Sequence, residues 1–236
     1  MEHRELRERV LEANRAIVRA GLVVLTFGNA SGVDRAAGVM AIKPSGVPYD
    51  RLDADAIVVV DLESGAVAAG EQRPSSDTPS HLVLYRRFAA IGGVVHTHST
   101  FATAWAQARR ELPCLGTTHA DHFRGPVPVT RALTGEEIAG AYEERTGDAI
   151  VETLERLRAD PLDMPAVLVA SHGPFAWGED VEAAVENAVA LEAVAELALR
   201  TLAIEPGAEP VSDELLLRHF LRKHGAGAYY GQGRET

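Results

Sequence analysis

Apolar positions recur every three or four residues in several segments of this chain, and short apolar runs separate those segments. Val10, Ala13 and Ile17, for example, share one face of a helix. Thr134 followed by Glu137 forms a capping-box pattern that starts another helix. Together these signals predict six helical segments, over residues 6–21, from 78 onward, and over 100–107, 134–158, 181–202 and 212–224.

The runs between the helices are short and of β type, and they fall at residues 22–26, 39–43, 57–61, 93–98 and 166–170. Glu63-Ser64-Gly65 is a turn sequence that returns the chain to Val67, which predicts antiparallel pairing there. Helices interleaved with short strands, without a visible linker or repeat, indicate the α/β class. We expect a three-layer α/β/α architecture formed by a single domain over residues 1–236.

Composition narrows the class of protein. The chain has 236 residues, and its 46% hydrophobic content is ample for a core, yet no apolar run approaches the roughly 20 residues that span a bilayer. A net charge of −11 argues against nucleic acid as a partner, and any anionic ligand needs a local positive pocket. Cys114 is the only cysteine, and the charged start of the chain has no signal-peptide core behind it, so we expect a cytoplasmic protein.

Two histidines one residue apart end the apolar run Val94-Val95-His96-Thr97-His98. Side chains on a strand alternate faces, so His96 and His98 project together from the end of the predicted strand. His172 follows another apolar run and leads into a glycine and a proline. Three neutral imidazoles with one open position are typical of a catalytic zinc site. The alternative is two surface histidines and an unrelated loop histidine.

Three polar clusters are candidates for ligand contacts. Residues 27–32 are rich in small residues and include Asn29, so the backbone amides and the Asn29 side chain can approach a ligand closely. Lys43-Pro44-Ser45-Gly46 combines a cation with a hydroxyl and a flexible backbone, as a phosphate cradle does. Residues 74–79 place two hydroxyls and a carboxylate at the predicted start of a helix, where the dipole favours an anion. Each cluster alone is also explained as an ordinary turn or helix cap.

The same segments resemble the class II aldolase/epimerase superfamily, and later segments resemble its L-ribulose-5-phosphate 4-epimerase branch. The similarity covers nearly the whole chain and implies a three-layer fold around a mostly antiparallel central sheet. The segments that carry it are Gly28-Asn29-Ala30-Ser31, Lys43-Pro44-Ser45-Gly46, residues 74–81, His96-Thr97-His98, and residues 116–121, 171–178, 221–225 and 229–232.

The resemblance also implies roles for individual residues. The metal site falls on Asp77, His96, His98 and His172, with Zn²⁺ as the expected divalent ion and Mn²⁺ as the alternative. The acid/base pair falls on Asp121 and Tyr230, which reach the site from the neighbouring subunit of a homotetramer. The contacts to phosphate and sugar fall on Asn29, Lys43, Ser45, Gly46, Ser75 and Ser76.

The implied reaction interconverts L-ribulose 5-phosphate and D-xylulose 5-phosphate. The hydrogen on carbon 4 is not acidic, so inversion there requires retro-aldol cleavage and recombination, with a Lewis-acid metal and two acid/base groups. Two alternative functions are open. A sister aldolase is the first, but that enzyme usually carries Glu where this chain has Asp77.

The second alternative is a non-catalytic protein that binds a metal or a sugar phosphate, and such a protein needs neither Asp121 nor Tyr230. The presence of Asp121 is also explained by a surface salt bridge, and that of Tyr230 by packing or disorder near the end of the chain.

Overall fold

The central sheet has seven strands in the part of the chain that the computed structural model describes, residues 2–225 and 227–229. Their order is β4-β3-β2-β1-β5-β7-β6, and each neighbouring pair is antiparallel. This arrangement confirms the expected antiparallel sheet. The strands are β1 (Gly28–Asp34), β2 (Val39–Ile42), β3 (Val58–Asp61), β4 (Val67–Ala69), β5 (Gly93–Thr97), β6 (Ala166–Leu168) and β7 (Pro174–Gly178).

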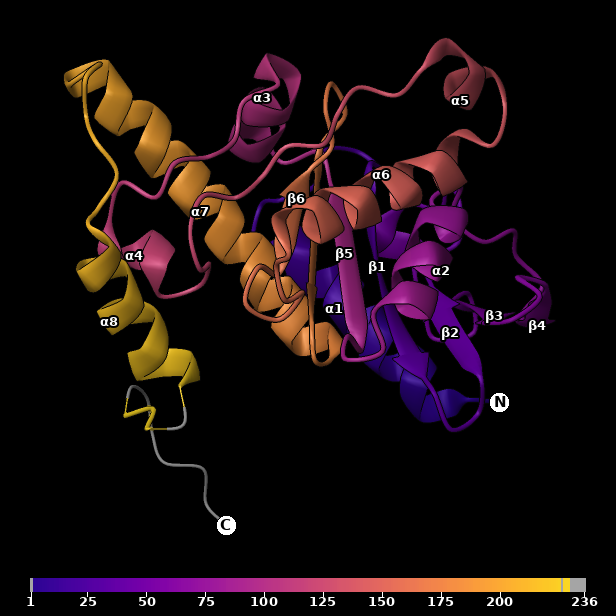
Figure 1. Ribbon diagram of the computed structural model, residues 1–236. Coiled ribbons are helices and arrows are strands. Elements are labelled where there is room, and N and C mark those ends of the chain that lie inside the picture. The colour runs from indigo at the N-terminus through magenta and orange to yellow at the C-terminus, as the bar shows by residue number, and fades with distance from the viewer. Residues whose placement is uncertain (1, 226, 230–236) are drawn as a thin grey trace.

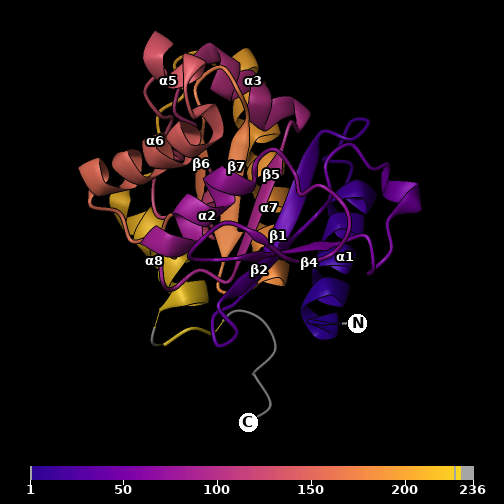
Figure 2. The same ribbon diagram turned by 90° about the vertical axis from the view of Figure 1, so that its right-hand side faces the viewer.

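Helices cover both faces of the sheet, which confirms the three-layer α/β/α architecture (Figure 1, Figure 2). α2 and α6 pack together on one face, and α1 and α7 lie on the other. None of the helices in the described ranges combines the length and the apolar content needed to cross a membrane. The helices are α1 (Arg4–Arg19), the 3-10 turn η1 (Tyr49–Arg51), α2 (Thr78–Arg87), α3 (Thr100–Ala108), α4 (Thr117–Ala120), α5 (Gly135–Ala139), α6 (Tyr142–Leu157), α7 (Val181–Ile204) and α8 (Asp213–His224).

The first strand lies later in the chain than the apolar pattern predicts. Residues 22–26 do not form a strand: the chain turns between Val24 and Phe27, and β1 begins at Gly28, within the segment that the sequence presented as a candidate for ligand contacts. Small residues are needed here because both sides of β1 are crowded. A Cβ on Gly32 would lie 3.1 Å from Val10 of α1, and one on Gly28 would lie 3.0 Å from the carbonyl oxygen of His96. β1 is therefore a central strand whose small side chains let α1 and β5 approach.

A buried asparagine fixes α1 to this strand. The Asn14 side-chain amide donates to the carbonyl of Ala30 at 3.0 Å, and the backbone N–H of Ala30 donates back to Asn14 Oδ1 at 3.0 Å. Both residues are fully buried, so this pair of bonds satisfies groups that water cannot reach. These bonds also hold β1 in place. Because Ala30 directly follows Asn29, they fix the part of β1 that carries the Asn29 side chain.

The predicted helix over residues 134–158 is two helices in the structure. Thr134 caps α5 through the predicted capping box with Glu137. Gly140 then takes a non-helical conformation, with φ −100° and ψ −122°, and ends α5. α6 starts two residues later at Tyr142, and this break turns the first residues of α6 toward the candidate site.

Candidate active site

His96 lies on the central strand β5, paired with Asn29 of β1 on one side and Phe175 of β7 on the other. Its ring stacks on the Phe175 ring, with centroids 4.2 Å apart. The His96 Nδ1–H donates to the carbonyl oxygen of Pro174 at 2.9 Å, because a carbonyl can only accept. This bond leaves the Nε2 lone pair available, which is the tautomer that a metal ligand requires.

His172 reaches the same place from the tight turn between β6 and β7. Ser171 adopts a left-handed conformation with φ 62°, and the backbone N–H of His172 donates to the carbonyl of Val169 at 3.0 Å. Gly173 is required on the other side, since a Cβ there would lie 2.7 Å from the carbonyl oxygen of Thr97. The turn is thus pressed against the end of β5, beside the two other histidines.

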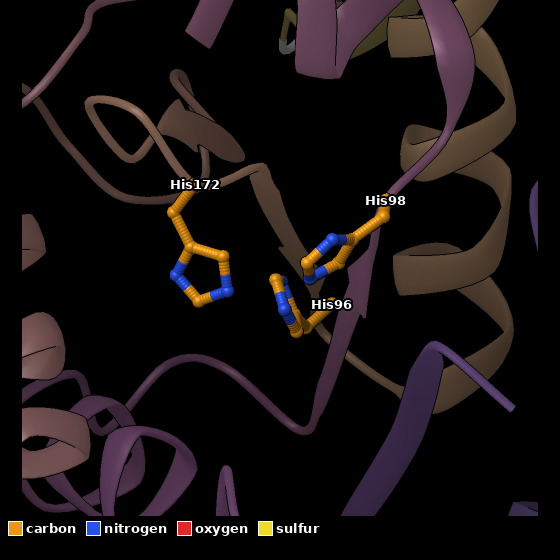
Figure 3. Close-up of side chains that lie close together, drawn as sticks. All are labelled: His96, His98 and His172. Atoms are coloured by element: carbon orange, nitrogen blue, oxygen red, sulfur yellow. The ribbon is translucent and has the colours of Figure 1, made fainter. Parts of the chain in front are cut away.

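The three imidazoles face one another (Figure 3). Their ring centroids are 4.8–5.0 Å apart, and one nitrogen from each ring lies within 4.8 Å of the others. Burial, reinforced by the neighbouring imidazoles, lowers the pKa of His172 to about 4 and also lowers the pKa of His98. Neutral rings present lone pairs, and lone pairs that converge in this way fit a divalent cation.

Asp77 lies next to this triad, just before α2. Its carboxylate accepts a hydrogen bond of 2.7 Å from the Asn29 side chain. Burial favours the protonated acid, but His96, His81 and the Asn29 bond outweigh it and lower the pKa of Asp77. The ionised carboxylate is a negative charge that would balance a cation held by the three histidines.

Two loops, at residues 43–46 and 73–76, form the part of the cavity lining where the sequence predicts contacts to phosphate. Two hydrogen bonds pair the loops, from the Ser75 N–H to the Lys43 carbonyl at 3.0 Å and from the Ser45 N–H to the Arg73 carbonyl at 2.9 Å. Gly46 has φ +67°, which favours glycine. The pairing brings the Lys43 ammonium and the hydroxyls of Ser45 and Ser75 to one side of a shared cavity.

Lys43 is a buried cation, with only 2% of its surface exposed. Its Nζ donates to the Pro44 carbonyl at 3.2 Å and lies 4.7 Å above the Tyr49 ring. Burial lowers the pKa of Lys43. It makes no salt bridge with any residue in the described part of the chain. A buried ammonium without a carboxylate partner is suited to bind an anion that enters the cavity.

One cavity of about 390 Å³ joins the two halves of the site. The predicted metal residues and the predicted phosphate and sugar residues all line it, so the structure brings these ten positions together. They are Asn29, Lys43, Ser45, Gly46, Ser75, Ser76, Asp77, His96, His98 and His172.

One member of the predicted acid/base pair, Asp121, does not line this cavity. Asp121 is the C-cap residue of α4, which packs against α8. Its carboxylate accepts bonds of 2.9 and 2.6 Å from Arg222 and one of 3.0 Å from His219. Burial tends to raise the pKa of Asp121, but these two partners lower it overall. Tyr230 lies outside the described residues.

Other histidines have partners away from the triad. His119 is buried, with Nε2 bonded to the Gly125 carbonyl at 2.8 Å. The His219 ring bonds to the carboxylate of Asp121, and the His224 ring donates from Nε2 to the backbone carbonyl oxygen of Asp121 at 2.8 Å. These three histidines do not line the cavity and are not part of the triad.

Three residues that line the cavity lie outside every cluster that the sequence singled out: Thr26, Tyr142 and Glu143. Tyr142 OH lies 3.4 Å from His172 Nδ1, at a distance suited to orienting that ring. The available signal was Gly140, which interrupts the helical periodicity shortly before an aromatic and an acidic residue. This glycine predicts that the chain changes direction, but the sequence does not indicate that the residues after it face the cavity.

Comparisons with known proteins agree with this geometry. The chain is 53% identical to the L-ribulose-5-phosphate 4-epimerase UlaF of Salmonella typhi over 228 residues, 97% of this chain and 99% of that protein, and the same values hold for that of Salmonella paratyphi A. A solved L-fuculose 1-phosphate aldolase superposes with a TM-score of 0.75 at 27% identity, covering 93% of this chain and 96% of that one. The enzyme of the same name from Thermus thermophilus superposes with a TM-score of 0.66, also at 27% identity, covering 88% and 98%. Residues 8–199 match the family described as class II aldolase and adducin N-terminal domain, and the chain belongs to that family.

Proposed function

We propose that the protein is a metal-dependent L-ribulose-5-phosphate 4-epimerase, which interconverts L-ribulose 5-phosphate and D-xylulose 5-phosphate. The observation that carries the proposal is the single cavity in which three histidines and Asp77 adjoin the buried cation Lys43. Identity of 53% to epimerases of that name over nearly the whole chain supports it. We include in the proposal that residues 1–236 form one domain and that the enzyme acts in the cytoplasm, where the buried thiol of Cys114 stays reduced.

His96, His98 and His172 would hold the divalent metal, with Asp77 as the associated carboxylate. We propose Zn²⁺ as the native ion, because neutral imidazoles are its preferred nitrogen ligands, with Mn²⁺ as the alternative. When bound, the ion supplies Lewis acidity toward negative charge that develops on the substrate oxygens. The buried Oδ1 of Asn29 has no hydrogen-bond partner among the described residues, and a substrate hydroxyl at the cavity would satisfy it.

Lys43 binds the substrate phosphate in this proposal, with the hydroxyls of Ser45, Ser75 and Ser76 and the flexible backbone at Gly46. The bond between carbons 3 and 4 breaks when a base takes the proton of the 4-hydroxyl. The aldehyde fragment that leaves, glycolaldehyde phosphate, stays tethered at Lys43 while it turns its other face. Recombination then forms the bond again with the opposite configuration at carbon 4.

Asp121 and Tyr230 fill the two acid/base roles in the proposal, because the alkoxide lies on opposite sides before and after the fragment turns. Asp121 is held as a carboxylate by Arg222 and His219, which suits a base. Since Asp121 does not line the cavity of its own subunit, it would serve the cavity of a neighbouring subunit in a homotetramer. A coupled assay that detects D-xylulose 5-phosphate formed from L-ribulose 5-phosphate tests the function, and a metal-loaded protein without this activity would contradict it.

The second candidate function is that of an aldolase, favoured by the structural likeness to L-fuculose 1-phosphate aldolases. The carboxylate at position 77 distinguishes the epimerase function from the aldolase function. Asp77 is held back by its 2.7 Å bond to Asn29, one methylene short of where a glutamate would reach. Release of the cleaved three-carbon fragment requires a proton, which a carboxyl group at position 77 can transfer only after it has taken one up. A more distant carboxyl group transfers that proton less well, and an unprotonated fragment can recombine.

We therefore expect Asp77→Glu to convert part of the turnover into cleavage. Epimerisation should fall by up to about a hundredfold, the loss that an ångström-scale misplacement can cause, while released dihydroxyacetone and glycolaldehyde phosphate increase. The measurement is product analysis of single reactions with L-ribulose 5-phosphate. Asp77→Asn is the matched control, since it lowers epimerisation and has no base with which to release fragments. Equal product ratios in the wild type and Asp77→Glu would contradict the argument.

The shared site makes a separate prediction. His96→Asn and Tyr230→Phe are each expected to be inactive, but unfolding them together and reassembling the mixture should restore activity. In a randomly mixed ring, about one quarter of the interfaces pair an intact metal site with an intact tyrosine, so about that fraction of wild-type activity should return. The control mixture is His96→Asn with His98→Asn, in which no intact metal site exists. Mixed tetramers seen by native mass spectrometry that stay inactive would rule out the shared site.

A further inference from the structure

α3 begins directly after the histidine pair but does not cap its own first turn. Ser99 is its N-cap residue, and the Ser99 side chain makes no capping bond. Glu192 of α7 does this instead, although it is about 90 residues away in the chain. Its Oε1 accepts from the Phe101 N–H at 2.8 Å, and its Oε2 accepts from the Ala102 N–H at 2.9 Å. A carboxylate bonded to two free amides at the positive end of a helix is a strong anchor.

A second bond joins the same two helices. The indole Nε1 of Trp105, in the middle of α3, donates to the carbonyl of Ala195 at 3.0 Å. Ala195 lies three residues after Glu192, on the same side of α7. α3 is thus attached to α7 at its start and at its centre, and Figure 1 shows α3 lying beside the later part of α7.

The far end of α3 contacts the turn that carries the third histidine. The Ala106 carbonyl accepts from the Ser171 N–H at 2.8 Å, and the Arg109 Nε–H donates to Ser171 Oγ at 2.9 Å. Ser171 has the left-handed φ of 62° and directly precedes His172. α3 therefore contacts the segments that carry two of the three histidines. His98 lies just before its first turn, and the last turn of α3 contacts Ser171, the residue before His172.

His98 depends on this helix more than the other two histidines do. His96 is oriented by the Pro174 carbonyl, and His172 has the Tyr142 hydroxyl at 3.4 Å. Within the described ranges, the ring of His98 makes no hydrogen bond. The ring has contacts with the rings of Phe27, His96 and His172. The backbone of His98 lies between the end of β5 and the first turn of α3, and Glu192 binds the free amides of that turn.

We propose that Glu192 is a positioning residue for the metal centre: its carboxylate seats α3 on α7, and α3 sets the positions of His98 and His172. The inference rests on the proposed metal site. Groups behind the ligands of metal sites typically change metal affinity by about 10- to 100-fold when they are removed. Replacing Glu192 should accordingly weaken metal binding even though Glu192 is not a ligand.

The test measures the dissociation constant of Zn²⁺ by chelator competition, and the visible absorption spectrum of the Co²⁺-loaded protein, which reports ligand geometry. Glu192→Ala should weaken Zn²⁺ binding by about tenfold or more and alter the Co²⁺ spectrum. Glu192→Gln keeps one oxygen acceptor but no charge, so its effect should be intermediate, and it decides the matter if the alanine variant does not fold. Glu196→Ala is the matched control, because Glu196 is one turn further along α7 and pairs only with Arg200 at the surface.

Two different failures can be told apart. If the wild type binds Zn²⁺ tightly and the folded Glu192 variants bind it equally well with the same Co²⁺ spectrum, Glu192 is a simple helix cap and the inference is overturned. If the wild type itself does not bind Zn²⁺ or Co²⁺, the proposed metal centre is wrong, and the inference falls with it. Weaker binding in the Glu192 variants and normal binding in Glu196→Ala support the proposal.

Discussion

A protein carrying His96→Asn is expected to lose its bound divalent metal and to lose turnover by about a thousandfold or more. The His96 lone pair points away from its bond to Pro174 and toward the other two rings, so its loss removes the central ligand of three. Lewis-acid stabilisation is worth several kcal/mol, and each 1.36 kcal/mol corresponds to about tenfold in rate. Metal content by atomic emission, measured beside the epimerase assay, checks both losses.

The control for this variant is His3→Asn. His3 has a left-handed φ of 53°, which asparagine adopts readily, and it lies at the start of α1 outside the cavity. It should keep full metal content and activity. Chelation of the wild type should reproduce the His96→Asn defect, and added Zn²⁺ or Mn²⁺ should reverse it. Full turnover by metal-free wild-type protein would show that the Lewis-acid role is wrong.

Lys43→Met is expected to raise the KM for L-ribulose 5-phosphate by about 30-fold or more. Loss of one partner from a buried charged hydrogen bond costs about 2–5 kcal/mol, and about 1.4 kcal/mol is tenfold in binding. The chain carries a net charge of −11, so the phosphate would meet a repulsive field without its local cation. Turnover should also fall, because the aldehyde fragment loses its tether during rotation. Steady-state kinetics separate the two effects.

Arg73→Met gives the matched control, since it removes the same charge from the partner loop at an exposed position. Screening by solvent should keep its effect on KM small. Unphosphorylated L-ribulose is a second control, because its weak turnover should respond little to Lys43→Met. An unchanged KM for the phosphorylated sugar would mean that Lys43 does not bind the phosphate.

The histidine pair shows what local spacing can predict. His96 and His98 are one residue apart on an extended segment, and alternation along a strand brings their rings to 5.0 Å without any knowledge of the fold. The capping box at Thr134 and the start of α2 at Thr78 are correct for the same reason, since their signals lie within one helical turn. Periodicity located most of the helices because burial of one face repeats along the chain.

The first strand shows where such reasoning fails. The apolar run at residues 22–26 favoured a strand, but the chain turns there, and Gly28–Asp34 is the strand instead. A rule that looks for bulky β-branched residues misses a strand whose side chains must be small. Their size is dictated by Val10 on α1 and by the backbone at His96, both distant in the sequence. The predicted ligand contact at Asn29 was nevertheless placed in the cavity.

The sequence by itself determined the residue types of the site and their local geometry: two imidazoles on one face of an extended segment, a lysine beside a serine and a glycine, and a carboxylate before a helix. Only the tertiary structure decided which of these meet. The order β1-β5-β7 places Asn29, His96 and Phe175 in register, and α3 links His98 to the turn at His172. The reason is physical. Local spacing follows from the fixed rise and twist of the backbone. Contacts such as that of Glu192 with Phe101 depend instead on how the layers pack, and the residues near each partner in the sequence do not determine that packing.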